Sequence, residues 1–279
     1  MPASLALPVP SAHRNRPLDH MQRHRHPPDR LKRRTDMPRD RLILDHWPVA
    51  ALYAIGDIHG CGAQLQAMEA EIVADAADIP GEKWIVTLGD QVDRGPDTRG
   101  VIDHLLGPPP AGFRRLSLLG NHEQMLLDCL ADPVAHGDWV PEGGDRTLAS
   151  YGISAVPAAD DPDAIAEAMA SGIPPAHVEF LESLPILLAL PGFVFVHAGI
   201  RPGTALEQQE DHDLIWIRRP FLDATDLGGL RVVHGHTPTP EPVITQIRYG
   251  IDTRCFASGT LTALRVLPTG ETRLLQVRS

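Results

Sequence analysis

Short, mainly apolar runs alternate with helical periodicities through the first half of this 279-residue chain, beginning near Leu42. Such runs predict buried strands, whereas apolar residues spaced three and four apart predict amphipathic helices. The expected strands cover 51–55, 84–88 and 115–119. The expected helices cover 62–78 and 97–106, and a third continues from Met125. This strand–loop–helix rhythm predicts a mostly parallel sheet with polar groups at the carboxyl ends of its strands.

Residues 132–184 break that rhythm, because the apolar spacing here indicates helices without intervening strands. We expect a short helix at 147–152 and two more at 161–171 and 175–183. Together they predict a helical cap inserted between the two halves of the sheet region. The sequence leaves open whether this insertion borders a functional cleft or is purely structural.

The last third of the chain has the pattern of short strands. They are expected at 193–196, 231–233, 243–247, 260–267 and 272–277. We expect these strands to form a second sheet. Two sheets packed face to face, with helices outside them, predict an α/β fold, a four-layer α/β/β/α sandwich that carries the helical insertion.

Composition narrows the class of protein. Hydrophobic residues make up 43% of the chain, as in ordinary globular proteins. No apolar run approaches the roughly 18 residues of a membrane span, so we predict no membrane partner. The three scattered cysteines, Cys61, Cys129 and Cys255, fit neither a disulfide framework nor a cysteine metal site. This usage indicates a reducing compartment and predicts a cytoplasmic location.

Charge is distributed unevenly along the chain. The first 40 residues hold nine basic and four acidic groups, while the remainder holds 16 basic and 32 acidic groups and carries a net charge of −16. Residues 1–41 also lack apolar periodicity, which predicts a disordered basic extension before a single folded domain at 42–279. A basic arm can contact nucleic acid or a membrane surface. We interpret it instead as a solvated tail and do not predict a nucleic-acid partner.

Polar residues beside glycines follow five of the expected strands. They are Asp57 and His59; Asp90, Asp93 and Arg94; Asn121 and His122; His197; and His236. Imidazole, carboxylate and amide donors without thiolates suit divalent Mn, Fe or Zn. Six of these donors are already too many for one closed zinc site, but six fit two metal ions that share a bridging carboxylate. Such a pair can clamp both oxygens of an in-line phosphoryl displacement.

These five loops resemble the motifs of a known family. The residues that carry the resemblance are Gly56-Asp57-Ile58-His59-Gly60, Gly89-Asp90-Gln91-Val92-Asp93-Arg94-Gly95, Gly120-Asn121-His122-Glu123, His197-Ala198-Gly199 and Gly235-His236-Thr237. They look like the phosphoprotein phosphatase branch of the calcineurin-like metallophosphoesterases, in its bacterial serine/threonine protein phosphatase type. The resemblance covers about residues 51–267.

The resemblance implies a role for each matching residue. It places Asp57, His59 and the bridging Asp90 on one metal ion, and Asp90, Asn121, His197 and His236 on a second. It implies that His122, paired with Asp93, protonates the leaving alcohol. It also implies that Arg94 and Arg218 hold the phosphate. A hydroxide derived from solvent between the metals would then attack phosphorus directly, and we expect Mn as the metal, with Fe or Zn as alternatives.

Several neighbouring residues keep alternative interpretations. His234 competes with His236 and is otherwise a core or supporting histidine, and Arg219 is the alternative to Arg218. Glu123 is interpreted as a supporting acid at a helix start, and Cys61 as a small buried residue. Arg254 stands where the family usually has glycine. It either alters the entrance to the cleft or lies on the surface.

Three functions remain open from sequence. The first is a serine/threonine protein phosphatase acting on phosphorylated proteins or peptides. The second is a dinucleoside polyphosphate hydrolase built on the same core. The third is an inactive binding scaffold, which the complete set of candidate ligands disfavours. The segment from Gly143 to Gly152 looks more like the protein phosphatases, whereas the substrate and oligomeric state are not determined by the sequence.

Overall fold

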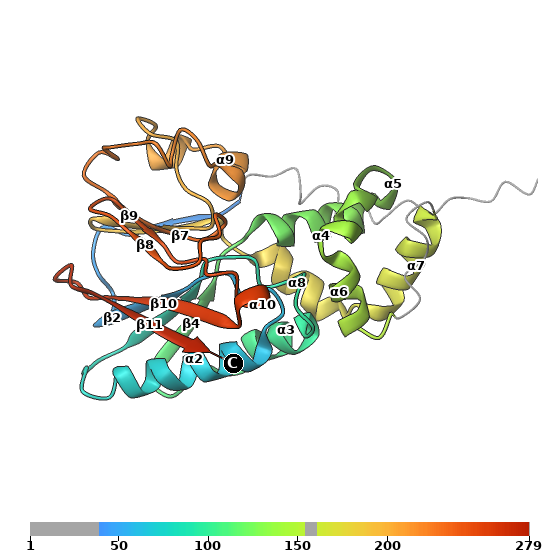
Figure 1. The fold of residues 1–279 in the computed structure, drawn as a ribbon, viewed down its shortest axis with the longest axis horizontal. Coiled ribbons are helices and arrows are strands. Elements are labelled where there is room, and N and C mark those ends of the chain that lie inside the picture. The colour runs from blue at the N-terminus through green and yellow to red at the C-terminus, as the bar shows by residue number, and fades with distance from the viewer. Residues whose placement is uncertain (1–38, 154–160, 279) are drawn as a thin grey trace, which may run out of the picture.

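The computed structural model of the chain describes residues 39–153 and 161–278, and contains two sheets that lie face to face (Figure 1). The first, sheet I, has the strand order β11-β10-β2-β3-β4, in which β2, β3 and β4 run parallel. Its strands are β2 (Ala51–Ile55), β3 (Lys83–Thr87), β4 (Phe113–Ser117), β10 (Thr260–Val266) and β11 (Thr272–Arg278). The parallel strands β2 to β4 confirm the strand–helix rhythm of the first half.

The second sheet, sheet II, has the strand order β1-β5-β6-β7-β9-β8. Its strands are β1 (Arg41–Ile43), β5 (Leu187–Leu190), β6 (Phe193–Val196), β7 (Arg231–His234), β8 (Val243–Ile244) and β9 (Arg248–Gly250). The sequence pattern missed β1 and β5. All four residues of β5 are buried, so no alternation of apolar and polar positions distinguishes this strand from the helices before it. The run expected at 243–247 is divided between β8 and the turn before β9.

The predicted membership of the last two strands was wrong. Both were expected in the second sheet, but β10 pairs antiparallel with β2 and β11 pairs antiparallel with β10, so both belong to sheet I. In the register, Leu264 lies opposite Ala54. Five of the seven β10 residues are buried, which suits a strand that has neighbours on both sides and apolar layers above and below.

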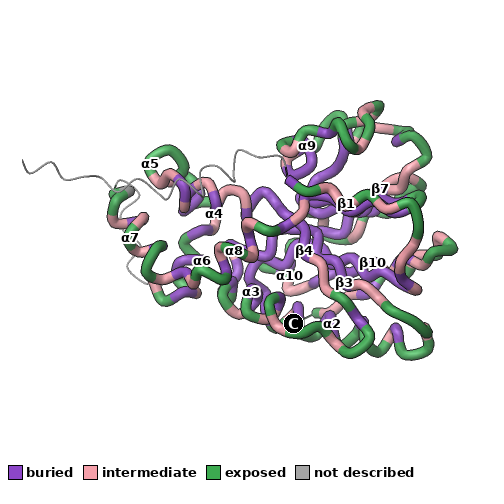
Figure 2. Tube along the Cα trace, turned by 180° about the vertical axis from the view of Figure 1, so that it is seen from behind, coloured by how far each residue is buried: buried purple, intermediate pink, exposed green. Residues whose placement is uncertain are grey.

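Alternating side chains of the central strands divide the core into layers. In β2, Leu52 and Ala54 pack between the two sheets, whereas Tyr53 and Ile55 pack under the helices of sheet I. In sheet II, Phe193 of β6 points into the space between the sheets. This period of two places buried positions on both faces of each sheet. The central strands are mostly purple, that is buried, in Figure 2. The result is the predicted four-layer sandwich.

Helices cover the outer faces of the sandwich. Sheet I is covered by α2 (Gly62–Asp75) and α3 (Thr98–Leu106), and sheet II by α9 (Asp211–Trp216) (Figure 1). Each helix of sheet I begins just after a strand-end loop. The Asp97 carboxylate accepts a hydrogen bond from the Gly100 N–H at 3.0 Å and so fixes the start of α3. The loops between strand and helix are thereby held in place.

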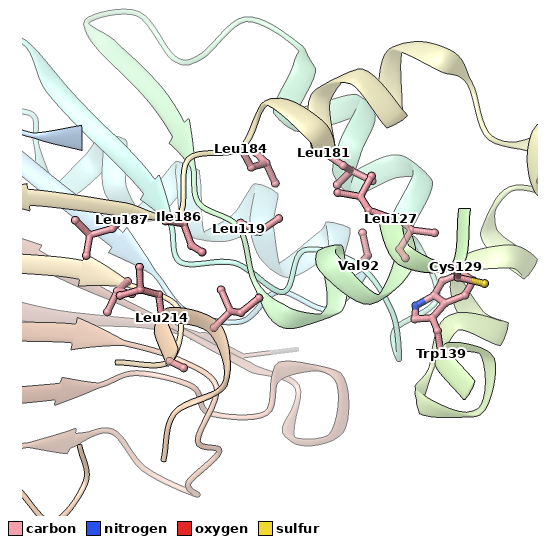
Figure 3. Packing of buried hydrophobic residues seen from close by; sticks show 14 of the residues in the cluster. Val92, Leu119, Leu127, Cys129, Trp139, Leu181, Leu184, Ile186, Leu187 and Leu214 are labelled. Atoms are coloured by element: carbon pink, nitrogen blue, oxygen red, sulfur yellow. The ribbon is translucent and has the colours of Figure 1, made fainter. Parts of the chain in front are cut away.

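The insertion is helical, as expected. It follows α4 (Asn121–Ala131) and consists of α5 (Pro133–His136), the 3₁₀ helix η1 (Gly137–Glu142), α6 (Gly144–Ser150), α7 (Pro162–Gly172) and α8 (Pro175–Ser183). These elements project from one end of the sandwich (Figure 1). Figure 3 shows their shared apolar core, in which Trp139 lies beside Cys129. That core is continuous with residues of sheet II such as Leu187.

Most of the predicted basic extension, residues 1–38, lies outside the described residues. From Arg39 onward the chain packs against the body: the Arg39 N–H donates to Asp211 at 2.7 Å, and its side chain is 8% exposed. The folded part thus reaches a few residues further towards the N-terminus than the boundary expected at 42. Among the described helices, none is long and apolar enough to cross a membrane. All three cysteines are free and buried.

Candidate metal centre and active site

The backbone of the strand-end loops is held in an unusual conformation. Among the described residues, six residues other than glycine have positive φ angles, and five of these are predicted site residues. The five are His59 (45°), Asp90 (51°), Asp93 (71°), Arg94 (66°) and His236 (60°). Because this conformation is unfavourable for residues with a Cβ atom, its concentration here shows that the surrounding fold fixes these side chains.

Two glycines allow loops from both sheets to approach one another. A Cβ atom on Gly235 would collide with a carboxylate oxygen of Asp57. The end of β7 therefore lies directly against the end of β2. Gly89, after β3 of sheet I, has a φ of 100°, and a Cβ atom there would lie 2.8 Å from Nδ1 of His197, which follows β6 of sheet II. These contacts require a residue without a side chain. They bring the carboxyl ends of strands from sheets I and II to one place.

Asp90 lies at the centre of the predicted ligands, with one carboxylate oxygen on each side. Its Oδ2 atom is 3.4 Å from His59 Nε2, and its Oδ1 atom is 3.3 Å from His197 Nε2. Two groups of ligand atoms, each within 4.8 Å of one another, share this residue. The groups are Asp57, Asp90 and His197, and His59, Asp90 and His122. All of these residues are buried.

The amide of Asn121 joins the histidines of sheet II. Its Oδ1 atom lies 2.8 Å from His197 Nε2 and 3.0 Å from His236 Nδ1. Asn121 is the first residue of α4, directly after the third strand-end loop. The structure therefore brings together all six residues that the sequence predicts as ligands: Asp57, His59, Asp90, Asn121, His197 and His236.

The chemistry of these donors fits a cation better than it fits hydrogen bonds among them. His59 Nδ1 faces the Val92 carbonyl at 2.8 Å, and His197 Nδ1 faces the Leu88 carbonyl at 2.9 Å. A carbonyl can only accept, so each Nδ1 carries the hydrogen and each neutral ring keeps a lone pair on Nε2 beside Asp90. The lone pair of His59 also accepts a hydrogen bond from Arg94 Nη1 at 3.1 Å. Burial lowers the pKa of His59 to about 3 and lowers that of His197, which disfavours a second proton. Lone pairs that face carboxylate oxygens are stabilised by a bound metal ion.

Buried acidic groups point to the same conclusion. Burial, followed by the negative charges of Asp252 and Asp90, raises the pKa of Asp57 well above its ordinary value. Asp252 is 5% exposed, and its own pKa is raised mainly by burial. Carboxylates gathered without a neutralising cation are costly. The residues present therefore fit a pair of divalent cations.

His122 differs from the other histidines of the site. Its Nδ1 atom lies 2.7 Å from Asp93 Oδ2, and the Asp93 side chain is fully buried. Burial alone would lower the pKa of His122, but the negative charges of Asp90 and Asp93 raise it above its ordinary value. Its Nε2 atom is 4.0 Å from Asp90 Oδ2. His122 is thus paired with a carboxylate, in a position next to the predicted ligands.

The candidate phosphate-binding arginines open onto a common cavity. A pocket of about 400 Å³ is lined by Arg94 and Arg218, together with Asp90, Asn121, His122 and His236. Neither arginine forms an ion pair with a described residue. Arg219, the alternative candidate, pairs with Asp223 at 3.3 Å and does not line this cavity. The geometry therefore favours Arg218 over Arg219.

Other predicted neighbours have clear positions. The Glu123 carboxylate accepts hydrogen bonds from four backbone N–H groups, those of Asp90, Gln91, Val92 and Gly120. It braces the Asp90 loop, as the interpretation of a supporting acid requires. His234 is buried, and its ring packs edge-on against Phe221 at 5.0 Å, away from the donor clusters. Arg254 has a φ of 57°, which explains why glycine suits its position, and it does not line the cavity.

Sequence reasoning missed several residues of the insertion. Trp139 and Thr147 donate hydrogen bonds to Asp93, and Asp138 and Glu142 line the cavity. The insertion therefore borders the cleft, one of the two roles left open by the sequence. No local sequence pattern indicates that the Trp139 indole reaches a carboxylate 46 residues away.

Comparison with known proteins identifies the family. The sequence profile of the calcineurin-like phosphoesterases matches residues 51–258, a range that contains all six predicted ligands. Its members are dinuclear metallophosphoesterases, the class that the fold and the paired donor clusters define. The chain belongs to the calcineurin-like phosphoesterase family.

Relatives within the family carry different names. Serine/threonine-protein phosphatase 1 of Salmonella typhimurium is 28% identical over 239 residues, which cover 81% of this chain and 95% of the relative. The asymmetrical bis(5′-nucleosyl)-tetraphosphatase PrpE of Halalkalibacterium halodurans is 28% identical over 235 residues, which cover 76% of this chain and 88% of the relative. A solved structure named as a candidate diadenosine tetraphosphatase has a TM-score of 0.58 at 22% identity, covering 85% of this chain and 98% of its own. That structural likeness supports the fold, and the family names leave the substrate open.

Proposed function

We propose that this protein is a dinuclear-metal phosphomonoesterase that removes phosphate from phosphoserine or phosphothreonine in proteins. Support for the metal centre comes from the two donor groups that share Asp90. The division of ligands between the two cations follows the family resemblance, since those groups pair Asp57 with His197 and His59 with His122. Asp57 and His59 would hold one cation with Asp90, and Asn121, His197 and His236 would hold a second with it. Divalent cations at these positions would neutralise phosphate charge and lower the pKa of a coordinated water. The donor set of nitrogen and oxygen suits Mn first, with Fe or Zn as alternatives.

Arg94 and Arg218 would bind the phosphate oxygens. Both line the cavity beside the donor clusters, and a planar guanidinium offers two parallel donors to a phosphate group. The Arg94 backbone N–H donates to the Gly143 carbonyl at 3.1 Å, and its guanidinium lies 5.2 Å from the centre of the Phe256 ring. These contacts orient Arg94 before a substrate binds, which reduces the entropy lost on binding.

His122 would donate a proton to the departing alcohol. Its Nδ1 atom is held by Asp93, so the other nitrogen, Nε2, is the one directed towards the reaction centre near Asp90. The side-chain alkoxide of serine or threonine is a poor leaving group. General acid catalysis by a positioned histidine offsets that difficulty. Asp93 stabilises the protonated ring and fixes its orientation.

Two acidic residues in the wall of the cavity favour one class of substrate. Asp138 and Glu142 of η1 line it, both are exposed, and neither forms an ion pair with a described residue. Negative charge next to the phosphate site repels the further phosphates of a dinucleoside polyphosphate. It attracts a peptide with Arg or Lys beside the phosphorylated residue. This acidic wall is the observation that favours a phosphopeptide.

The alternative is a dinucleoside polyphosphate hydrolase, which the PrpE relative supports at similar identity and coverage. The same donor clusters would serve that reaction. In a dinucleoside polyphosphate, further negatively charged phosphates lie next to the scissile phosphate. In a phosphoprotein, a peptide lies there. A measurement of specificity at the acidic wall therefore separates them.

The decisive experiment compares kcat/KM for a phosphoserine peptide containing arginine and for diadenosine tetraphosphate, with the same Mn-loaded protein. We expect the wild type to prefer the peptide. The double variant Asp138→Asn, Glu142→Gln should move the ratio of the two values towards the dinucleotide on the order of tenfold, as expected for two partly screened charges. Asp145→Asn is the matched control, because Asp145 is an exposed acid of α6 that does not line the cavity.

A hundredfold preference of the wild type for diadenosine tetraphosphate would contradict the proposed substrate. So would a ratio that responds equally to the double variant and to Asp145→Asn. Neither result would affect the assignment of the metal centre, since elemental analysis tests that separately.

A further inference from the structure

The Asp93 carboxylate accepts three side-chain hydrogen bonds, and only one of them comes from His122. Trp139 Nε1–H donates to Oδ2 at 2.8 Å, the oxygen that also faces His122 Nδ1 at 2.7 Å. The Thr147 hydroxyl donates to Oδ1 at 2.7 Å. Both oxygens of this fully buried group are therefore occupied by the insertion as well as by the histidine.

The hydroxyl network has a defined direction. A hydroxyl has one hydrogen, and Thr147 gives it to Asp93, so Thr98 must be the donor in the contact of 3.0 Å between the two threonine oxygens. The Asp93 backbone N–H in turn donates to Thr147 Oγ1 at 2.9 Å and to Thr98 Oγ1 at 3.2 Å. Asp93 has a φ of 71°. The two threonines thus hold both the backbone and the carboxylate of a residue in an unfavourable conformation.

The indole is itself held in place. Trp139 and Thr147 are both fully buried, and a Cβ atom on Gly144 would lie 2.5 Å from Trp139 Cε2, so the glycine lets the chain pass directly over the ring. In Figure 3 the indole nitrogen lies on the side of the ring that faces Val92, the neighbour of Asp93. The ring packs among Leu127, Cys129 and the other apolar residues of the insertion. A side chain packed in this way has little freedom to move away from Asp93.

We propose that Trp139 and Thr147 are positioning residues, through which the helical insertion orients the Asp93 carboxylate and hence the ring of His122 for proton donation. This inference rests on the role proposed above for the Asp93–His122 pair. Both donors are neutral, so they stabilise a buried carboxylate without competing with His122 as a positive charge. The Asp93 rotamer is fixed by its two remaining donors, and the histidine then has one geometry available to it. The insertion is thus part of the machinery that delivers the proton.

The test removes one hydrogen at a time and preserves shape. Trp139→Phe keeps an aromatic ring without its N–H, and Thr147→Val keeps the branched volume without the hydroxyl. In each Mn-loaded variant kcat is measured on phosphoserine, whose alkoxide needs a proton, and on p-nitrophenyl phosphate, whose leaving group departs as a stable anion. We expect kcat on phosphoserine to fall by about ten- to a hundredfold, the worth of a hydrogen bond to a charged group, with a change of less than about threefold on p-nitrophenyl phosphate.

Two controls separate positioning from a purely structural role. Thr147→Ser restores the hydroxyl and should recover kcat on phosphoserine to within about threefold of wild type, whereas a packing defect would not be repaired by a smaller side chain. Trp84→Phe removes another indole hydrogen bond to a carboxylate, that of Glu82 at 3.1 Å on the surface of sheet I. It should leave both activities unchanged. The threonine pair keeps the test decisive if Trp139→Phe does not fold.

Equal loss on both esters, or Thr147→Ser behaving like Thr147→Val, contradicts the positioning role. Metal content that falls in the variants contradicts it as well, because the network touches Asp93 and not the predicted ligands. Wild-type protein that hydrolyses neither ester would instead overturn the proposed phosphomonoesterase function. The two failures are therefore distinguishable.

Discussion

Two parts of the site use the same side chain, histidine, in different settings. In the metal-binding part, the Nδ1 atoms of His59 and His197 face backbone carbonyls. In the part proposed to donate a proton, His122 Nδ1 faces the Asp93 carboxylate. A carbonyl fixes a neutral ring with a free lone pair, whereas a carboxylate favours the protonated ring. In the proposed assignment, the partner of one ring nitrogen therefore distinguishes the rings that would bind a cation through the other nitrogen from the ring that would carry a proton there.

The two parts are also held in place by different groups. The Glu123 carboxyl group braces the Asp90 loop by accepting four backbone hydrogen bonds, and burial raises its pKa to about 8. Neutral donors from the insertion brace Asp93 instead. Substitutions among the proposed metal ligands and their supports should therefore change metal content. Substitutions around the Asp93–His122 pair should change only the delivery of the proton. The following predictions test that separation.

The largest effect is expected for Asp90→Asn. The amide offers one oxygen and no charge, so it cannot face both donor clusters as the carboxylate does. Substituting a residue that only supports a metal ligand lowers metal affinity by up to about 10²-fold. Asp90 is itself a proposed ligand, so we expect a larger loss of affinity at both metal positions, and loss of activity with it. Elemental analysis measures both metals. Wild-type protein treated with a chelator and then resupplied with Mn is the control, and full activity in a metal-free sample would disprove metal dependence.

A smaller effect is expected for His122→Asn. Metal content should be nearly that of wild type, because His122 is assigned to the proton and not to a cation. We expect kcat on phosphoserine to fall by about 10²–10⁴, the usual worth of general acid catalysis, and to fall less on p-nitrophenyl phosphate. If both substrates slow equally while a metal is lost, His122 is a ligand and the separation of the two parts fails.

The smallest effect is expected for Glu123→Gln. An amide can accept with its oxygen only, so backbone N–H groups of the Asp90 loop lose their acceptor. Metal affinity should fall by about 10–100-fold, with kcat at saturating Mn nearly unchanged. Glu69→Gln is the matched control, since Glu69 is also buried but pairs with Arg115 at 2.7 Å, and neither residue lines the cavity. Loss of thermal stability alone in both variants would show that Glu123 has no special link to the metal centre.

Much of the site could be predicted from sequence because its motifs are local. Each ligand lies within a few residues of a glycine after an apolar strand, and parallel strands end at the same edge of a sheet. The order of strands and helices from Ala51 to Asn121 was also predictable, since each of these strands is followed by its own helix. The choice between Arg218 and Arg219 could not be predicted from sequence, because adjacent residues of one type differ only in the direction of their side chains.

Non-local pairing explains the predictions that failed. The sequence places β10 and β11 last, next to the strands of sheet II, yet β10 pairs with β2 more than 200 residues earlier in the chain. Strand pairing depends on which edge is free in the folded molecule, and a strand's own residues do not encode it. β6 was predicted, but β5 was missed, because burial on both faces removes the alternation that would separate it from the helices before it.

The sequence by itself determined the kinds of chemical group present, their order and the strand ends that carry them, because these follow from spacing of a few residues. The tertiary structure decided which nitrogen of each histidine is free, since that depends on carbonyls and carboxylates 29 to 109 residues away. It also decided that the insertion supports Asp93, through an indole 46 residues and a hydroxyl 54 residues distant. Hydrogen bonds act over about 3 Å in space whatever the separation in sequence, so only the folded chain assigns these partners.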